Sequence, residues 1–560
     1  MSRRVITLLT CLFASAPAAH AAPVPAGDAS AFKPTVAVRL APLDKLLDDV
    51  RYTATLISRF APTEQEAKEF ATGVDQGLDK VLGPDWRKAV DATKPLLGFA
   101  TVDAKLPEST GGVLIPVKDE AAFRKLLANL VGRLDDPKDG IQRFEFPGQR
   151  DAEGRPINGY LRIANGYAYL TLRNEAAISA AKAPTPEQVV AGDPTAGISA
   201  RINLDRVPGE FRQRTLGSVQ QFKAMVGGAQ GPGVPGFISL AGFALYGPIM
   251  ALYPLVEPAV RDGRELTIDM RFDRKHLNLG MDLTLTAQPG SELEKLTRAV
   301  RHSTSLFPQI FGPETAGRAM IRTTIPEDLR KLIIPQIEMG FGRLPDEVPV
   351  WGKFTAKIGE AVLPTLKEGE IDLAVGLRGP YDGAGYGLFG GLRLKDAAAL
   401  EKAFRTAVQE LPKEARAMFV LDSVTIGETK VHAVKLPPLP EPAKSLFGTD
   451  VLLVAFRNDA MVMAFGQSSM GSLHDGLDAK PQPTPKTLME VSGKRLVPLV
   501  TKIDAEAGKK FQAFLGNELD RIPILEASVE GGAALKAHFG NVLTSFVPLG
   551  FFAIRTVAVP

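Results

Sequence analysis

The chain of 560 residues is almost free of cysteine: Cys11 is the single thiol. It lies within a short apolar run, Val5–Phe13, which follows Arg3 and Arg4 and precedes the small residues of Ala19–Ala21. This order is typical of a secretory signal peptide, and the apolar run is too short to span a bilayer. Cleavage after residue 21 predicts a mature chain with no disulfide, no thiolate nucleophile and no cysteine-ligated metal.

Export to the periplasm or the medium follows from this interpretation. The alternative is a lipoprotein signal in which Thr10-Cys11 ends the lipid-attachment box. Thr10 is larger than the residue that such a box usually carries, and apolar sequence continues beyond Cys11. The sequence therefore favours cleavage near Ala22 over lipid attachment, and stability has to come from the packed core.

The chain also has little net charge. It carries 66 Lys and Arg against 63 Asp and Glu, and loss of Arg3 and Arg4 with the signal leaves (66 − 2) − 63 = +1. Nucleic-acid binding requires a basic stripe, so no nucleic-acid partner is predicted. Hydrophobic residues make up 45% and charged residues 23% of the chain, which indicates a globular protein.

Paired metal ligands are also missing. The predicted mature chain retains five histidines, none of them three or four residues from another: His276, His302, His432, His474 and His538. No metal site is predicted, although ligands scattered along the sequence remain an alternative.

One motif resembles a nucleotide-binding loop. Residues 385–390, GYGLFG, match G-x-G-x-x-G, but GLRLKD follows where a dinucleotide site requires a helix. These glycines are expected in a twisted hairpin, and no cofactor is predicted. GQSSMGS at 466–472 has the wrong spacing for a nucleophile elbow. The sequence nominates no catalytic residue.

An internal repeat decides the expected architecture. The segments 90–130 and 366–408 both read as strand, turn, strand, Lys-Asp and amphipathic helix, with Asp119 and Asp396 as helix N-caps. The similarity extends upstream and downstream, and Asn165-Gly166 marks a tight hairpin. We expect an α+β fold built from two tandem copies of a module of antiparallel hairpins and amphipathic helices.

The predicted division of the chain follows from this repeat. Its parts are a signal peptide at 1–21, a Pro/Ala-rich tether at 22–34, module 1 at 35–312 and module 2 at 313–560. An apolar insertion at about 224–260 is specific to module 1.

The combination of signal peptide, duplication and the PVKDEAAF…NGYAYLT pattern resembles a family of uncharacterised exported bacterial proteins with repeated α+β modules. The resemblance covers most of the chain. It implies the duplicated fold and no activity.

The insertion raises the main functional question, because no charged residue occurs between Lys223 and Glu257. Residues 237–256 are expected to be largely helical and bent near Pro248. Three interpretations are open: a membrane span, a buried helix, or an exposed apolar surface. A span conflicts with a module that must close its sheet on one side of the membrane. The contact residues of an exposed surface would be Phe237, Phe243, Tyr246, Met250 and Tyr253.

These observations favour an exported, non-catalytic binding or structural protein whose ligand the sequence does not name. The first alternative is a carrier or sensor of apolar ligands or of the membrane surface, acting through residues 237–256. In that case the partner is an apolar ligand, a membrane surface or another protein. The second alternative is a hydrolase whose site is assembled from residues far apart in sequence.

Overall fold

The protein divides into two compact units in the computed structural model. Unit 1 comprises Met1–Gly217 with Val260–Gln288, and unit 2 comprises Ser218–Ala259 with Pro289–Pro560. The structure describes residues 34–58, 65, 73, 82–105, 109–150, 154–190, 192–228, 256–274, 278–301, 304–325, 327–347, 351–382, 385–485, 487–515, 522–530 and 534–540. The predicted signal peptide, most of the tether, and Phe237, Phe243, Tyr246, Met250 and Tyr253 of the insertion lie outside these residues.

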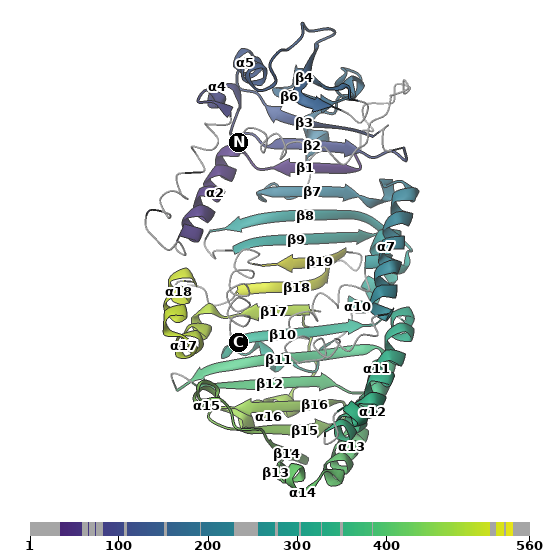
Figure 1. Ribbon diagram of the computed structural model, residues 1–560, viewed down its shortest axis with the longest axis vertical. Coiled ribbons are helices and arrows are strands. Elements are labelled where there is room, and N and C mark those ends of the chain that lie inside the picture. The colour runs from purple at the N-terminus through teal and green to yellow at the C-terminus, as the bar shows by residue number, and fades with distance from the viewer. Residues whose placement is uncertain are drawn as a thin grey trace. The chain divides into compact units, whose positions relative to one another are not determined.

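Unit 1 contains an antiparallel sheet whose first strand lies in its middle, paired with β2 on one side and β7 on the other (Figure 1). The strand order is β4 (Ile141–Arg150), β5 (Pro156–Ala164), β6 (Tyr167–Leu172), β3 (Thr110–Pro116), β2 (Leu96–Thr101), β1 (Val36–Leu40), β7 (Ile198–Asn203), β8 (Gly263–Asp273) and β9 (Asn278–Ala287).

Unit 2 repeats this order. Its antiparallel sheet runs β13 (Phe419–Ile426), β14 (Thr429–Lys435), β15 (Val451–Arg457), β16 (Ala460–Gly466), β12 (Gly385–Arg393), β11 (Glu370–Tyr381), β10 (Thr315–Thr324), β17 (Thr487–Val491), β18 (Ile522–Glu530) and β19 (Ala534–Phe539). Here too the first strand lies between the second strand and a late one. Only β13, at one end of the order, has no counterpart among the described strands of unit 1. The α+β fold with two tandem modules is confirmed.

The helices follow the same repeat, because they connect equivalent strands. In the order of the chain, the helices up to β9 are α2 (Leu43–Ser58), α4 (Trp86–Ala89), α5 (Glu120–Val131), η3 (Glu175–Ile178), α6 (Pro186–Val189), η4 (Leu204–Arg206), α7 (Gly209–Gly228) and α9 (Val256–Asp262). Those that follow are α10 (Glu292–Arg301), η7 (Pro308–Phe311), α11 (Glu327–Glu347), α12 (Gly352–Glu368), α13 (Ala397–Glu410), α14 (Lys413–Arg416), α15 (Glu441–Phe447), α16 (Ser469–Asp478), α17 (Gly493–Ile503) and α18 (Ala505–Leu515).

Local signals explain where these elements begin and turn. Asp119 accepts a hydrogen bond from the backbone N–H of Ala122 at 2.7 Å, and Asp396 accepts one from that of Ala399 at 2.8 Å. Both carboxylates satisfy a free N–H group of the first helical turn, as predicted. Asn165 and Gly166 adopt the positive φ angles of a two-residue hairpin turn between β5 and β6.

Apolar clusters cover both faces of each sheet in the part that contains β6 or β15, because neighbouring residues of a strand point to opposite sides. In β6, Ala168 packs in the cluster that includes Phe123 of α5, whereas Tyr167 and Tyr169 pack with Ile178 of η3. In unit 2, β15 divides in the same way between a cluster with α13 and a cluster with α16. The chain's two tryptophans also occupy equivalent places, since Trp86 begins α4 before β2 and Trp351 immediately precedes α12 before β11.

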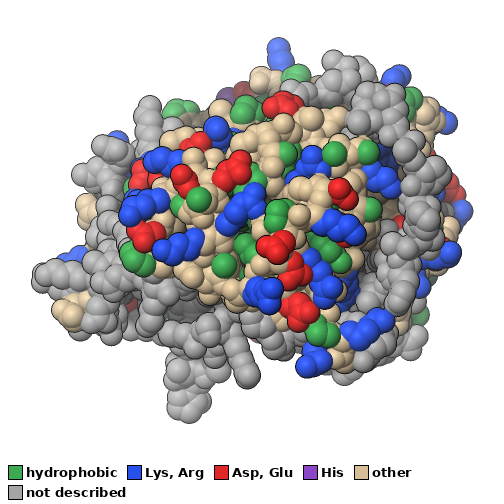
Figure 2. Space-filling model, turned by 90° about the horizontal axis from the view of Figure 1, so that it is seen from above, with side chains coloured by type: hydrophobic (Ala, Val, Ile, Leu, Met, Phe, Trp, Pro, Cys, Tyr) green, Lys and Arg blue, Asp and Glu red, His purple; other side chains and the backbone are tan. Residues whose placement is uncertain are grey.

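The end of unit 1 that carries β4 and α5 is shown in Figure 2. Basic and acidic side chains are interspersed there, and hydrophobic ones are scattered between them. Arg124 pairs with Glu120, and Arg143 pairs with Glu145. The described side chains of this face therefore carry charges of both signs. Within the parts of the chain that the structure describes, no helix is long and apolar enough to cross a membrane.

Candidate functional site

One face of the unit 1 sheet becomes polar where β1, β7, β8 and β9 lie side by side. Ser199 pairs with Arg39 on one side and with Asp269 on the other, and Asp269 pairs with Asp282. Directly paired residues share a face, and every second residue returns to it. The same alternation brings Arg201, Asn203, Thr267 and Glu265 to this side. We call this surface, from Arg39 to Glu265, the polar face.

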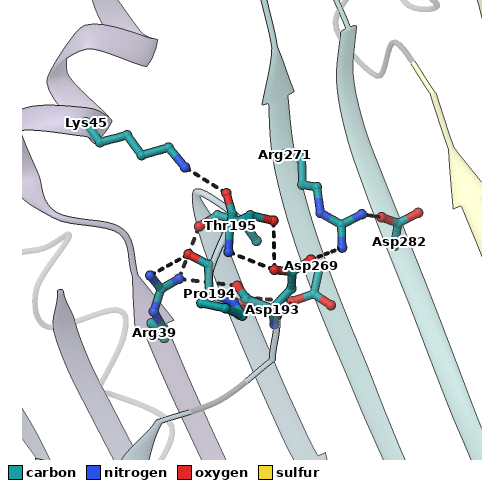
Figure 3. Close-up of polar contacts among 10 residues, drawn as sticks. Arg39, Lys45, Asp193, Pro194, Thr195, Asp269, Arg271 and Asp282 are labelled. Atoms are coloured by element: carbon teal, nitrogen blue, oxygen red, sulfur yellow. Dashed lines mark hydrogen bonds and ion pairs between the residues drawn. The ribbon is translucent and has the colours of Figure 1, made fainter.

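The loop before β7, residues 192–197, is fastened to the polar face by basic side chains from two elements (Figure 3). Arg39 of β1 is 7% exposed and donates hydrogen bonds to the carbonyl oxygens of Asp193, Pro194 and Ala196 at 3.3, 2.8 and 3.2 Å. Lys45 of α2 donates to the carbonyl of Thr195 at 2.7 Å. Cationic donors therefore satisfy the backbone carbonyls of a loop that contains no regular structure.

The carboxylate of Asp193, which belongs to the loop itself, stabilises the loop conformation. Its Oδ1 accepts from the backbone N–H and the hydroxyl of Thr195, both at 2.7 Å, and its Oδ2 accepts from Arg271 at 2.5 Å. These bonds, those from Thr195 first, lower the pKa of Asp193 to about 2. Arg271 also pairs with Asp282 of β9. The loop and two strands are thus joined through one guanidinium group.

Asp269 provides a second, buried anchor. It is 8% exposed and accepts from the hydroxyl of Ser199 at 2.6 Å and from the backbone N–H of Asp193 at 3.1 Å. A Cβ added to Gly192 would lie 2.4 Å from Asp269 Oδ1, so this approach requires glycine. Ser199 is 0% exposed, and no substrate can reach its hydroxyl without opening the loop. We interpret the hydrogen-bonded pair of Ser199 and Asp269 as structural: it holds the loop against the sheet.

A pocket of about 290 Å³ lies farther along the polar face, at the far end of β7. It is formed by α6, the end of β7, η4, the start of β8 and the residue that leads into β1. Its lining is polar except for one proline and comprises Pro34, Gln188, Arg201, Asn203, Asp205, Arg206, Arg264 and Glu265.

Two arginines of this pocket keep donors available. Arg201 donates through Nη2 to the carbonyl of Val190 at 3.0 Å, while its Nε is buried without a hydrogen-bond partner. Arg264 and Arg201 form no salt bridge with any described residue, although Asp205 and Glu265 line the same hollow. Glu265 accepts from the hydroxyl of Thr267 at 3.3 Å. The lining carries three cationic and two anionic side chains, so it is suited to an anion.

In unit 2, partly exposed charged side chains surround His432, which is itself 0% exposed. Its Nδ1 accepts the backbone N–H of Asp422 at 3.2 Å, and its Nε2 lies 3.5 Å from Glu401. Arg405 bridges Glu401 and Asp422. Burial, followed by the nearby Arg405 charge, lowers the pKa of His432. The side chain is therefore neutral at pH 7, and it is enclosed by Phe404 and Phe456.

The residues that the sequence singled out are dispersed in the structure. Among the described residues, no three His, Cys, Asp or Glu side chains form a group that could hold a metal ion. His276 and His302 lie outside the description. GYGLFG lies in strand β12, as predicted, and not at the start of a helix.

The sequence interpretation missed the pocket residues, because Arg201, Arg264 and Glu265 belong to no motif. A signal for them was present in the alternation of ISARIN and RELTIDMRF, where every second residue of each strand is polar. That alternation predicts a polar face but not which strands share it. Comparison with protein-family models, with curated proteins and with solved structures gives no match.

Proposed function

We propose that the protein is an exported binding protein that holds a small polar ligand without transforming it. The pocket at the end of β7 is the observation that carries this proposal. Its volume of about 290 Å³ lies at the lower end of the range for small-molecule sites, and polar groups converge on it from several elements.

The contrast between the two parts of the polar face supports binding. Around Asp193 the charged side chains are engaged with one another and with backbone groups, which fits a structural role. In the pocket, Arg201 has one hydrogen bond to a described residue, through Nη2, and Arg264 forms no ion pair with a described residue, so both groups have N–H donors for a bound ligand.

Native mass spectrometry of the full chain purified from the cell envelope tests the proposal. We expect a small-molecule adduct on the wild type that is lost in Asp205→Trp, since an indole ring would fill the pocket whatever the ligand is. Glu210→Trp is the matched control, because Glu210 is an exposed acid on the adjoining α7 and does not line the pocket. A wild type without an adduct, or an adduct that survives in D205W, would contradict binding in this pocket.

The reverse of the same four strands favours a second candidate, a carrier of apolar ligands. The residues that alternate with those of the polar face are apolar and mostly partly buried: Val36, Val38, Leu40, Ile198, Ala200, Ile202, Leu266, Ile268, Met270, Met281, Leu283 and Leu285. Titration with a fluorescent fatty acid tests this candidate. Saturable binding that is unchanged in D205W would support it, and the absence of binding would exclude it.

A further inference from the structure

We propose that the pocket of unit 1 binds a small oxyanion, a carboxylate or a phosphate group, between the guanidinium groups of Arg201 and Arg264. This inference rests on the binding function proposed above and adds the chemical class of the ligand. Nothing in the sequence pattern assigned these arginines to a site.

Arg201 gives the first argument. It projects from β7 in the row that pairs with Thr267, and one of its nitrogens, Nη2, is already fixed on the Val190 carbonyl. The fixed bond orients the planar group, and Nη1 has no acceptor among the described residues. Guanidinium groups recognise carboxylate and phosphate through parallel N–H donors. An oxyanion at this place would supply the missing acceptor.

Arg264 gives the second argument. It is the second residue of β8, lies next to Glu265, lines the same hollow and forms no ion pair with any residue in the described ranges. The lining carries three arginines against two acids, and neither Arg201 nor Arg264 forms an ion pair with a described residue, so the potential in the pocket is positive. An anionic ligand neutralises this potential, whereas a cation would increase it.

The pocket acids limit what the ligand can be. Asp205 and Glu265 line the same space and repel a negative charge placed near them. The oxyanion therefore has to be small enough to contact the arginines while it keeps its distance from the carboxylates. Removal of one acid should then strengthen binding. Partial unfolding of a variant would weaken binding, so it cannot explain an increase.

Isothermal titration of the full chain tests the inference with two probes, inorganic phosphate and succinate, each against sodium chloride of equal ionic strength. We expect one of these oxyanions to bind with a single site. Arg201→Met and Arg264→Met should each weaken this binding about tenfold or more, as expected for loss of a charge-assisted hydrogen bond. Glu265→Gln should strengthen it several-fold.

Arg143→Met is the matched control, because Arg143 is an exposed arginine of unit 1 on β4 that does not line the pocket. It should leave the affinity unchanged. Binding of phosphate alone or of succinate alone would identify the source of the oxyanion. The inference is overturned if neither probe binds beyond the chloride control, or if R201M and R264M bind like the wild type.

Failure of the oxyanion inference can be separated from failure of the binding function. An adduct in native mass spectra that is lost in D205W, together with no response to either probe, would keep the binding function and replace the ligand class. If native mass spectra show no adduct and neither probe binds, both the binding function and the oxyanion inference are wrong.

Discussion

Arg39 and Arg322 occupy the same position in the two repeats. Each lies on the first strand of its sheet, is nearly buried, and donates to a backbone carbonyl of the loop that leads into the next paired strand, β7 or β17. They differ in how many of their N–H donors form hydrogen bonds. Arg39 reaches three carbonyls, whereas Arg322 donates to Thr484 at 3.0 Å and keeps Nε and Nη1 buried without hydrogen-bond partners.

This difference predicts unequal effects of the same substitution. Arg39→Met should lower the free energy of unfolding of unit 1 by about 2–4 kcal/mol, because it leaves three loop carbonyls without their cationic donor. Arg322→Met should cost less in unit 2, about 1–2 kcal/mol, since it removes two unsatisfied buried donors together with a charge that partly neutralises its buried cross-strand neighbour Asp372.

Urea unfolding followed by tryptophan fluorescence separates the two units. Trp86 lies in unit 1 and Trp351 in unit 2, so Trp351→Phe and Trp86→Phe backgrounds report one unit each. Equal losses for R39M and R322M would contradict the interpretation that the number of satisfied carbonyls decides the cost.

The glycines of β12 provide a second prediction, which concerns packing. A Cβ on Gly387 would lie 2.3 Å from the backbone oxygen of Gln467 on the neighbouring chain segment, and that oxygen has little freedom to move. Gly387→Ala should therefore destabilise unit 2 by about 3 kcal/mol or more.

Gly390→Ala is the matched control in the same strand, because its nearest neighbour would be the flexible end of Met463 at 3.4 Å. We expect a change of about 1 kcal/mol or less. Thermal unfolding of the two variants measures the difference. Similar melting temperatures would show that the close approach of the Gln467 backbone is not the reason for glycine at position 387.

The pH dependence of unit 2 should depend on His432. Its pKa is lowered from 6.5, so between the lowered value and 6.5 the unfolded chain binds a proton that the folded chain does not. Stability from this group is complete above pH 6.5 and declines as the pH falls below it. The slope is at most about 1.4 kcal/mol per pH unit.

His432→Asn tests this expectation, because the amide oxygen can accept the Asp422 N–H without titrating. Urea unfolding in the Trp86→Phe background, at several values between pH 7.5 and 5, should show a shallower decline than that of the wild type. His474→Asn, a substitution of an exposed histidine on α16, should keep the wild-type decline. If the free energy of unfolding of H432N falls with pH as steeply as that of the wild type, other groups cause the pH dependence.

Export gives the fourth prediction. The protein isolated from the native envelope should begin near Ala22 and carry no lipid, because the Ala-His-Ala site fits signal cleavage better than Thr10-Cys11 fits lipid attachment. Intact-mass measurement decides between the two. A diacylglyceryl group on Cys11 would show that the lipoprotein alternative is right.

The features that could be predicted from the sequence alone are those set by local residue patterns. The N-caps Asp119 and Asp396 and the Asn165-Gly166 turn depend on neighbours within three or four residues, so their geometry could be expected before any strand was paired. The repeat of these signals was sufficient to predict two α+β modules.

Only the tertiary structure decided which strands lie beside each other and therefore which side chains meet. Arg39 is 154 residues from Asp193, and their contact exists because β1 pairs with β7 in the middle of the sheet. The pocket has the same origin, since α6, β7 and β8 converge only after that pairing. A periodic pattern specifies the face of a strand that a residue occupies. It does not specify the neighbour across the sheet, which is set by packing of the whole unit.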